Sequence, residues 1–204
     1  ERLFAEHGYD GVGMRALADE AGVNLGATTY HYGSKEKLYI ETFMRRFRPI
    51  NAARVELLRQ VEEEAAGQTV SVEKIVDCML RPPFLDALAH PHFLALLARN
   101  LFMPPPFMRE LLLKEVAPAN EPFVAALARS LPNLPPEVLW LRNMFAAGAL
   151  LTFAGHLGKI PRPISGEPQF IEFALKELVR FISAGFRSQP GSPVSMKLPL
   201  LFPP

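Results

Sequence analysis

Apolar residues recur every three to four positions along most of this 204-residue chain. Met14, Leu17 and Ala21 show the spacing near the start, and Ala174 and Leu178 show it near the end. This spacing places side chains on one face of an α-helix, whereas the alternating runs of Val, Ile, Thr and Tyr that mark strands do not occur. The sequence therefore predicts an all-α protein.

Twenty prolines and thirteen glycines divide the helical pattern. Short helices are expected within residues 1–33, and Ser34 is expected to cap a longer helix that is disturbed near Pro49 and resumes over residues 51–66. Ser71 is expected to cap the next helix, and prolines are expected to separate short segments between residues 82 and 136. Two long helices, about 136–158 and 167–187, should flank a loop at 161–166, and residues 189–204 should form a proline-rich tail.

The composition excludes several classes of protein. Hydrophobic residues make up 49% and the net charge is +1, which is unlike a disordered chain and unlike a protein that coats nucleic acid by bulk charge. Cys78 is the single cysteine, so no disulfide can form within the chain. The longest apolar run, 144–157, is interrupted by Gly and His, and the first residues resemble an amphipathic helix rather than a signal peptide. A soluble, cytoplasmic protein with no membrane partner is expected, with an excess of three positive charges within residues 25–48.

Residues 13–24 carry the pattern of a short helix, a glycine turn and the start of a second helix. Gly22 suits the left-handed residue that ends a helix, and Asn24 suits the cap of the next one. Val23 is expected to plug the angle between the two helices. This is a helix-turn-helix layout, although helix pairs joined by a glycine turn also occur without any DNA role.

The segment that follows, residues 25–32, favours the DNA-binding interpretation. Its outward positions are small or hydroxylated, so the helix can lie close to base edges in a major groove, with Thr methyl and hydroxyl groups in contact with bases. Tyr30, His31 and Lys35 can reach phosphates, which fixes the register of the protein on DNA. The competing interpretation is that Tyr30 and Tyr32 are core aromatic residues and Lys35 a solvated charge; for Tyr32 the core is favoured.

Three segments together, 4–10, 14–23 and 30–38, resemble the DNA-binding domain of the TetR/AcrR family of repressors in order and in spacing. Two positions depart from the family pattern. Gly13 stands where a Ser or Thr usually caps the helix, and Thr29 stands where many members have a phosphate-binding Tyr, so Tyr30 is expected to take or share that role. The first helix is expected to begin upstream of Glu1.

The resemblance implies a small three-helix helix-turn-helix domain at 1–47, then a larger antiparallel helical bundle at 48–188 for effector binding and dimerisation, then the tail at 189–204. It implies a homodimer formed by the last two long helices, released from a pseudo-palindromic operator by an effector, with Pro49 as a hinge. We expect DNA contacts from Arg15, Asn24, Leu25, Gly26, Ala27, Thr28, Thr29, Tyr30, His31 and Lys35.

Aromatic and Met residues of the larger domain predict an apolar cavity of a few hundred Å³. Its effector is expected to be an apolar, acyl or aromatic compound whose polar end meets Arg99, Asn143 or His156. The expected wall residues are Phe84, Phe93, Arg99, Phe102, Trp140, Asn143, Met144, Phe153 and His156.

Two other classes of function remain open at this stage. A small helical enzyme is one, but the sequence contains no nucleophile–base motif, no HExxH and no phosphate loop, so no catalytic residue, cofactor or metal is expected. His90 and His92 are a weak metal pair because positions i and i+2 do not share a helix face. A dimeric interaction module without a DNA role is the other.

Overall fold

The computed structural model describes residues 1–157 and 167–191, and these residues form helices and no strand, as predicted. The predicted loop at 161–166 and most of the predicted tail lie outside these ranges. The helices are α1 (Arg2–His7), α2 (Met14–Ala21), α3 (Leu25–Tyr32), α4 (Lys35–Glu64), α5 (Val72–Ala89), α6 (Pro91–Phe102), α7 (Pro106–Ser130), α8 (Pro136–Leu157) and α10 (Pro168–Arg187).

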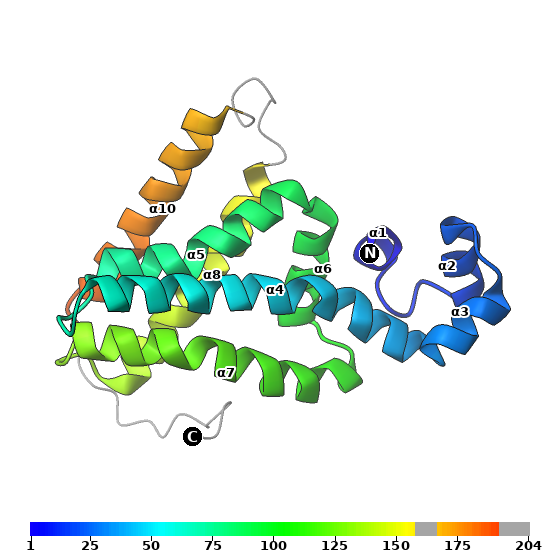
Figure 1. The fold of residues 1–204 in the computed structure, drawn as a ribbon, viewed down its shortest axis with the longest axis horizontal. Helices are drawn as coiled ribbons and strands as arrows, with labels where there is room; N and C mark the ends of the chain where they lie inside the picture. Colours follow the sequence, from blue (N-terminus) through cyan, green and yellow to red (C-terminus); the bar gives the residue numbers. More distant parts are fainter. Residues whose placement is uncertain (158–166, 192–204) are drawn as a thin grey trace.

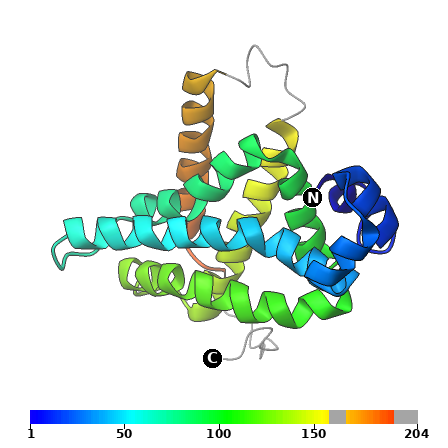
Figure 2. The same cartoon turned by 45° about the vertical axis from the view of Figure 1, so that its right-hand side comes forward.

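Helix α4 connects the two ends of the molecule. Figure 1 shows α1, α2 and α3 gathered around its first turns, while α5 and α7 run along the rest of its length. Figure 2 shows the three short helices at one end of the molecule, close beside the larger bundle. Since α4 crosses residues 47 and 48 without interruption, the predicted domain boundary falls inside a continuous helix.

The two largest clusters of buried side chains hold most of the helices together. The larger one lies in the bundle and joins α5, α7, α8 and α10, with Ile75, Phe84 and Phe123 at its centre. The second cluster joins α1 and the first half of α4 to α6 and α7, and Phe4, Tyr39 and Phe43 are fully enclosed in it. The small N-terminal domain therefore shares a core with the larger one, because burying these aromatic residues stabilises the contact between them.

Several prolines that were expected to break helices do not break them. Pro82 and Pro83 lie inside α5, Pro118 and Pro122 lie inside α7, and Pro49 lies inside α4. The predicted breaks at Pro82-Pro83, Pro118 and Pro122 are therefore wrong, whereas those at Pro91, at 104–106 and at 132–136 coincide with helix boundaries. Other prolines act as helix starters, since Pro91, Pro106, Pro136 and Pro168 each occupy the first helical position, where the missing N–H has no intrahelical partner to lose.

One interior proline has its lost hydrogen bond replaced from another helix. Pro83 cannot donate to the carbonyl of Met79 four residues earlier in α5. The guanidinium of Arg54 on α4 donates to that carbonyl instead, with 3.0 Å between Nε and O. This contact explains how α5 tolerates a proline in its interior, and it brings a charged side chain between two packed helices.

The local signals for helix ends are confirmed. The side chain of Ser34 accepts a hydrogen bond from the Lys37 amide, and Ser71 accepts one from the Lys74 amide. Gly13 precedes α2 without a side-chain cap, as its lack of a side chain predicts. These signals depend on residues within one turn, so they can be recognised in sequence.

Candidate DNA-binding head and ligand pocket

Helices α2 and α3 form the predicted helix-turn-helix. Gly22 is in the left-handed conformation with a φ of 65°, and the Val23 amide donates back to the Ala18 carbonyl at 3.0 Å. Asn24 caps α3, because its side-chain oxygen accepts a hydrogen bond from the Gly26 amide at 2.6 Å. The glycine turn and the asparagine cap therefore set the angle between the two helices.

Burial along α3 separates the residues that can face DNA from those that cannot. Thr28 is buried, with 8% of its surface exposed, and its hydroxyl donates to the Asn24 carbonyl at 3.3 Å. The expectation that Thr28 reads bases is therefore wrong, since it faces the head's own core. The exposed side of α3 carries Gly26, Ala27, Thr29, Tyr30 and His31, while Leu25 is half-buried and Asn24 serves the cap.

Tyr30 is the most exposed of the large hydrophobic side chains of the head. Its exposed fraction is 86%, and its ring meets the His31 ring edge-on with 5.6 Å between centroids. An aromatic side chain with this exposure contributes nothing to the core, so packing does not explain its presence. Tyr32 and Val23 are also exposed, at 41% and 50%, which corrects the expectations that they fill the core and the interhelical angle.

Lys35 is held by Tyr9 rather than left in solvent. Its ammonium donates to the Tyr9 carbonyl, with 3.1 Å between Nζ and O, and lies 4.2 Å from the centroid of the Tyr9 ring. Burial raises the pKa of the Tyr9 hydroxyl, and the nearby carboxylates of Glu36 and Asp10 raise it further. Lys35 therefore fastens the turn after α1 to the start of α4, so a DNA contact from it would add to a structural role.

Among the basic side chains of residues 1–48, some form ion pairs with carboxylates and others do not. Glu1 pairs with Arg45 and Arg46, Glu115 pairs with Arg48, and Glu6 pairs with Arg2. Arg15, Lys35 and Lys37 make no ion pair among the residues that the structure describes. The expected positive face over 25–48 is thus neutralised at Arg45, Arg46 and Arg48, and the charge without a carboxylate partner lies on α2 and the first turn of α4, the elements before and after α3 in the chain.

A hydrophobic pocket lies in the larger domain between α4, α5, α6, α7 and α8. Its volume is about 140 Å³, less than the few hundred Å³ expected, and similar to cavities of ~150 Å³ that hold a benzene molecule. Phe47, Phe93 and Leu150 supply apolar wall, and polar groups come from Asn51, Arg54, Asn120 and Asn143. Of the nine expected pocket residues, Phe93 and Asn143 line it.

The other seven expected residues lie outside this pocket. Phe84 and Phe153 stack on each other with 5.9 Å between centroids, and Trp140 is half-buried on α8. Phe102 and Met144 are exposed at 70% and 50%. Arg99 points to α1, where it donates to the Ala5 carbonyl at 3.5 Å. His156 is exposed, and its Nδ1 lies 2.7 Å from the Thr152 carbonyl.

The polar residues that the sequence did not single out are Asn51, Arg54 and Asn120. They meet because α4 and α7 pack side by side, and such long-range packing leaves no local pattern in the sequence. The one available signal is an arginine on an otherwise apolar helix stripe. Leu58 lies one turn after Arg54 on the same face and is buried, so the helical spacing predicts that Arg54 also points inward.

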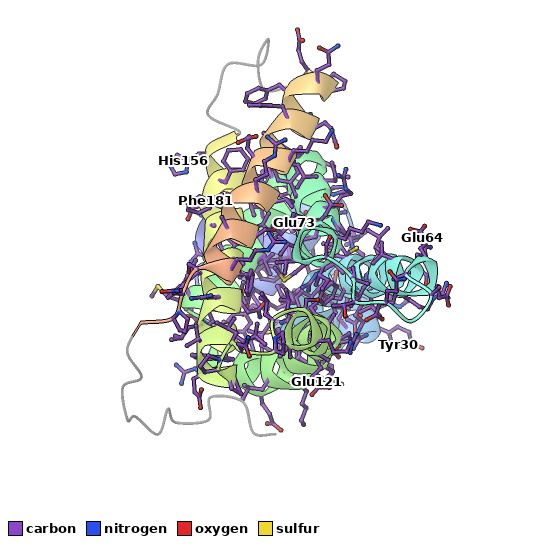
Figure 3. The ribbon with its side chains drawn as sticks, turned by 90° about the vertical axis from the view of Figure 1, so that its left-hand side faces the viewer. Tyr30, Glu64, Glu73, Glu121, His156 and Phe181 are labelled. Atoms are coloured by element: carbon purple, nitrogen blue, oxygen red, sulfur yellow. The ribbon has the colours of Figure 1, made fainter. Side chains whose placement is uncertain are left out.

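Helices α8 and α10 expose large apolar side chains. Figure 3 shows them side by side, with Phe181 and His156 labelled. Phe145, Phe173 and Phe181 are 67%, 60% and 73% exposed. By length and composition alone, Pro136–His156 of α8 could cross a membrane, which corrects only the expectation that its apolar run is too interrupted to do so. Of its most apolar window, 28% is buried, and core helices of soluble proteins pass the same test. Exposed apolar area of this kind marks a surface that binds a partner.

Metal ligands do not gather in any part of the chain that the structure describes. His90, one of the two histidines considered for a metal pair, instead places its Nδ1 2.9 Å from a carboxylate oxygen of Asp86, four residues earlier in α5. The pair closes the end of α5, because His90 is the C-cap residue that follows Ala89. This contact gives the histidine a local structural role.

The head and its exposed helix α3 define a helix-turn-helix protein of the kind that reads DNA. A family model described as "Bacterial regulatory proteins, tetR family" matches residues 1–42. A second model, described as "Tetracyclin repressor-like, C-terminal domain", matches residues 77–185, just over half of the chain. The chain belongs to the TetR family, a family of regulators and not of enzymes.

Three curated relatives are each described as the HTH-type transcriptional repressor AcnR. The proteins from Corynebacterium efficiens and Corynebacterium glutamicum are 49% and 46% identical over 39 residues, which are 19% of this chain and 21% of each relative. The protein from Corynebacterium diphtheriae is 32% identical over 90 residues, 44% of this chain and 36% of its own length. The chain thus spans between a fifth and about a third of the curated relatives it matches.

Proposed function

We propose that the protein is a homodimeric transcriptional repressor that binds a pseudo-palindromic operator through α3 and leaves it when a small effector binds the larger domain. The observation that carries the proposal is the exposed face of α3, where Tyr30 is 86% exposed beside small and hydroxylated neighbours. Membership in the TetR family and the repressors among its relatives support it. Such a regulator acts in the cytoplasm, where the bacterial chromosome lies.

The DNA contacts follow from the exposed residues of the head. Gly26 and Ala27 let the α3 backbone approach base edges closely, and Thr29 offers a methyl and a hydroxyl group. Tyr30 reaches toward phosphate from the same face. Arg15 on α2 and Lys37 on α4, which lack carboxylate partners among the described residues, would neutralise phosphates on either side of α3.

Dimerisation supplies the second reading head that a pseudo-palindrome requires. The exposed phenylalanines of α8 and α10 are the surface for it, since a second copy would bury the apolar area that one copy leaves in water. Pairing α8 and α10 with their mates about a two-fold axis would bury well above ~1,000 Å².

Release by an effector requires that the pocket and the head change together. Phe47 of α4 lines the pocket and also belongs to the core shared with the head. A ligand that binds one arrangement of α4 more tightly than another shifts the population toward that arrangement, and the heads move with it. The continuity of α4 through Pro49 favours movement of the whole helix over bending at that proline.

The test is selection of binding sites from a pool of random duplex DNA by the purified full chain. The proposal predicts enrichment of a two-fold symmetric sequence whose half-sites lie about one helical turn apart, 10–10.5 base pairs or a multiple of that spacing. A pool that stays unenriched after repeated rounds, while a known helix-turn-helix repressor enriches its site in parallel, would contradict a role in reading DNA.

A further inference from the structure

Arg54 is held in the pocket by neutral groups alone. Its Nε donates to the Met79 carbonyl at 3.0 Å, and its two terminal nitrogens donate to the side-chain oxygens of Asn51 at 2.7 Å and Asn120 at 3.0 Å. The guanidinium carbon also lies 4.7 Å from the centroid of the Phe123 ring. These bonds use three of the five guanidinium N–H groups, so two have no partner among the described residues.

The charge of Arg54 has no carboxylate to balance it. Arg48 and Arg59, its neighbours on α4, pair with Glu115 and Glu56, whereas Arg54 makes no ion pair within residues 1–157 and 167–191. Residues 158–166 and 192–204 contain neither Asp nor Glu, so the rest of the chain supplies no acidic side chain either. A desolvated cation without a counter-ion is costly, and it attracts an anion that enters its site.

The electrostatic state of Arg54 agrees with this geometry. Burial lowers the pKa of its guanidinium to about 10, with no carboxylate acting to raise it. The group is therefore positively charged at neutral pH, and its charge is not offset. By contrast, the pKa of Arg81 in the same bundle is raised, because Asp77 and Glu172 both accept hydrogen bonds from it.

The space beside Arg54 limits what the anion can be. The pocket is about 140 Å³ and its lining is mostly apolar, with Phe93, Leu97 and Leu150 facing the space that Arg54 borders. A cavity of ~150 Å³ is filled by a benzene ring, so a ligand with a compact apolar body and one charged end matches both its size and its lining. A carboxylate suits the planar guanidinium, because its two oxygens can accept two parallel N–H···O hydrogen bonds.

We propose that Arg54 is the anion-recognising residue of the effector pocket, and that the effector is a small carboxylate with an aromatic or short aliphatic body. The inference rests on the proposed function, since it names the chemical class of the ligand for the same pocket. Asn143 on α8 lines the same space and would hydrogen-bond the second side of the carboxylate.

A carboxylate at this position would act on α4. Arg54 belongs to that helix, while its present partners Met79 and Asn120 belong to α5 and α7. A carboxylate bound to the two remaining N–H groups adds a charged partner to the guanidinium and changes the balance of contacts that hold α4 against the bundle. This places the charge of the ligand at the helix that continues into the DNA-binding head.

The direct test is binding of benzoate and of benzamide, its neutral isostere, to the full chain without DNA, followed by ligand-observed NMR. Acetate serves as a control that has the charge and lacks the apolar body. We expect benzoate to bind at least about tenfold more tightly than benzamide, because hydrogen bonds to charged groups are stronger than neutral ones. Equal affinity for the two compounds, or no benzoate binding at millimolar concentration, would overturn the proposal.

Two variants test whether the preference for benzoate over benzamide depends on the charge of Arg54. Arg54→Gln keeps a hydrogen-bond donor and removes the charge, so the advantage of benzoate over benzamide should disappear. If that variant fails to fold, Asn143→Asp serves, because it keeps the shape of the side chain and adds a negative charge to the site; it should weaken benzoate about tenfold or more and weaken benzamide much less, so that the preference for benzoate is lost. Arg129→Gln, a change to an arginine far along α7 that pairs with Glu62, is the matched control and should keep the preference.

A second measurement separates this inference from the proposed function. Benzoate is added to the complex of the protein with its selected DNA, and the fraction of DNA bound is followed by fluorescence anisotropy. Release that requires Arg54 supports both ideas. Arg54-dependent binding without release supports the carboxylate site and contradicts effector control through it, whereas loss of the preference in the first test overturns the carboxylate site even if the protein binds DNA.

Discussion

The hydroxyl of Tyr39 accepts a hydrogen bond from the side-chain amide of Asn100, with 2.9 Å between Oη and Nδ2, and both residues are fully buried. Tyr39 lies on the part of α4 that packs in the head, and Asn100 lies on α6. Burial raises the pKa of the Tyr39 hydroxyl, so it stays neutral near physiological pH. This polar contact inside an aromatic cluster fixes the position of the head on α6.

The substitution Tyr39→Phe should lower the free energy of unfolding by about 1–3 kcal/mol, because it leaves the Asn100 side-chain oxygen buried without its hydrogen-bond donor. Chemical denaturation monitored by circular dichroism measures the change. Tyr32→Phe, at an exposed position, is the control and should stay within about 0.5 kcal/mol of the original protein. A Tyr39→Phe variant as stable as this control would show that the contact contributes little.

Arg81 joins α5 to α10, and the stability that its ion pairs give to the folded protein should depend on pH. It donates to Asp77 at 2.8 Å and to Glu172 at 3.0 Å, and the hydrogen bond lowers the pKa of the Glu172 carboxyl below 4.5. Because the folded pKa lies below the unfolded one, the stabilisation is present above about pH 4.5 and is lost as the pH falls through the folded value.

Glu172→Gln should therefore reduce stability at pH 7 by less than about 1 kcal/mol, since the side chain is 44% exposed, and the difference from the original protein should vanish toward pH 3. Urea denaturation at several pH values measures this. Glu121→Gln, an exposed change on α7, is the control. If the difference in unfolding free energy between Glu172→Gln and the original protein increased as the pH falls, the result would be inconsistent with this ion pair.

Phe181→Glu should convert the proposed dimer into a monomer, because it places a charge on the apolar surface of α10, where Phe181 is 73% exposed. Light scattering at micromolar concentration measures the mass. Phe102→Glu introduces the same charge at a similarly exposed phenylalanine on α6 and should leave the dimer intact. An original protein that is monomeric at these concentrations and still binds DNA normally would remove the proposed interface.

Features set by neighbouring residues were predictable from the sequence, whereas those set by distant packing were not. The caps at Asn24, Ser34 and Ser71 each depend on a side chain and an amide two or three residues away, so their positions were predicted correctly. The prolines inside α5 and α7 were misread because the stability of those helices comes from packing in the bundle. At Pro83 the replacement hydrogen bond comes from α4, on a different segment of the chain.

In the candidate sites, too, features set by neighbouring residues were predictable and features set by distant packing were not. The glycine turn and the small or hydroxylated residues that follow it predicted α3 as the recognition helix. They did not show that Thr28 points inward and Thr29 outward, since this eight-residue helix has almost no preferred apolar face. The pocket residues were predicted from residue type alone. Most of these predictions were wrong because most of the aromatic residues pack in the core or lie exposed on the surface. Arg54 was missed because its partners come from three helices.

The most direct test of a DNA-reading head is the affinity of the original protein, Tyr30→Ala and Lys114→Ala for the selected duplex, measured by fluorescence anisotropy over a range of salt concentrations. Tyr30 is exposed on α3 and supports no core contact, while Lys114 is an exposed lysine on α7, where it pairs with Glu110. We expect Tyr30→Ala to weaken binding about tenfold or more without loss of stability, and Lys114→Ala to leave both the affinity and the salt slope unchanged. Equal affinity of Tyr30→Ala and the original protein at physiological salt would contradict the assignment of α3 as the DNA-reading helix.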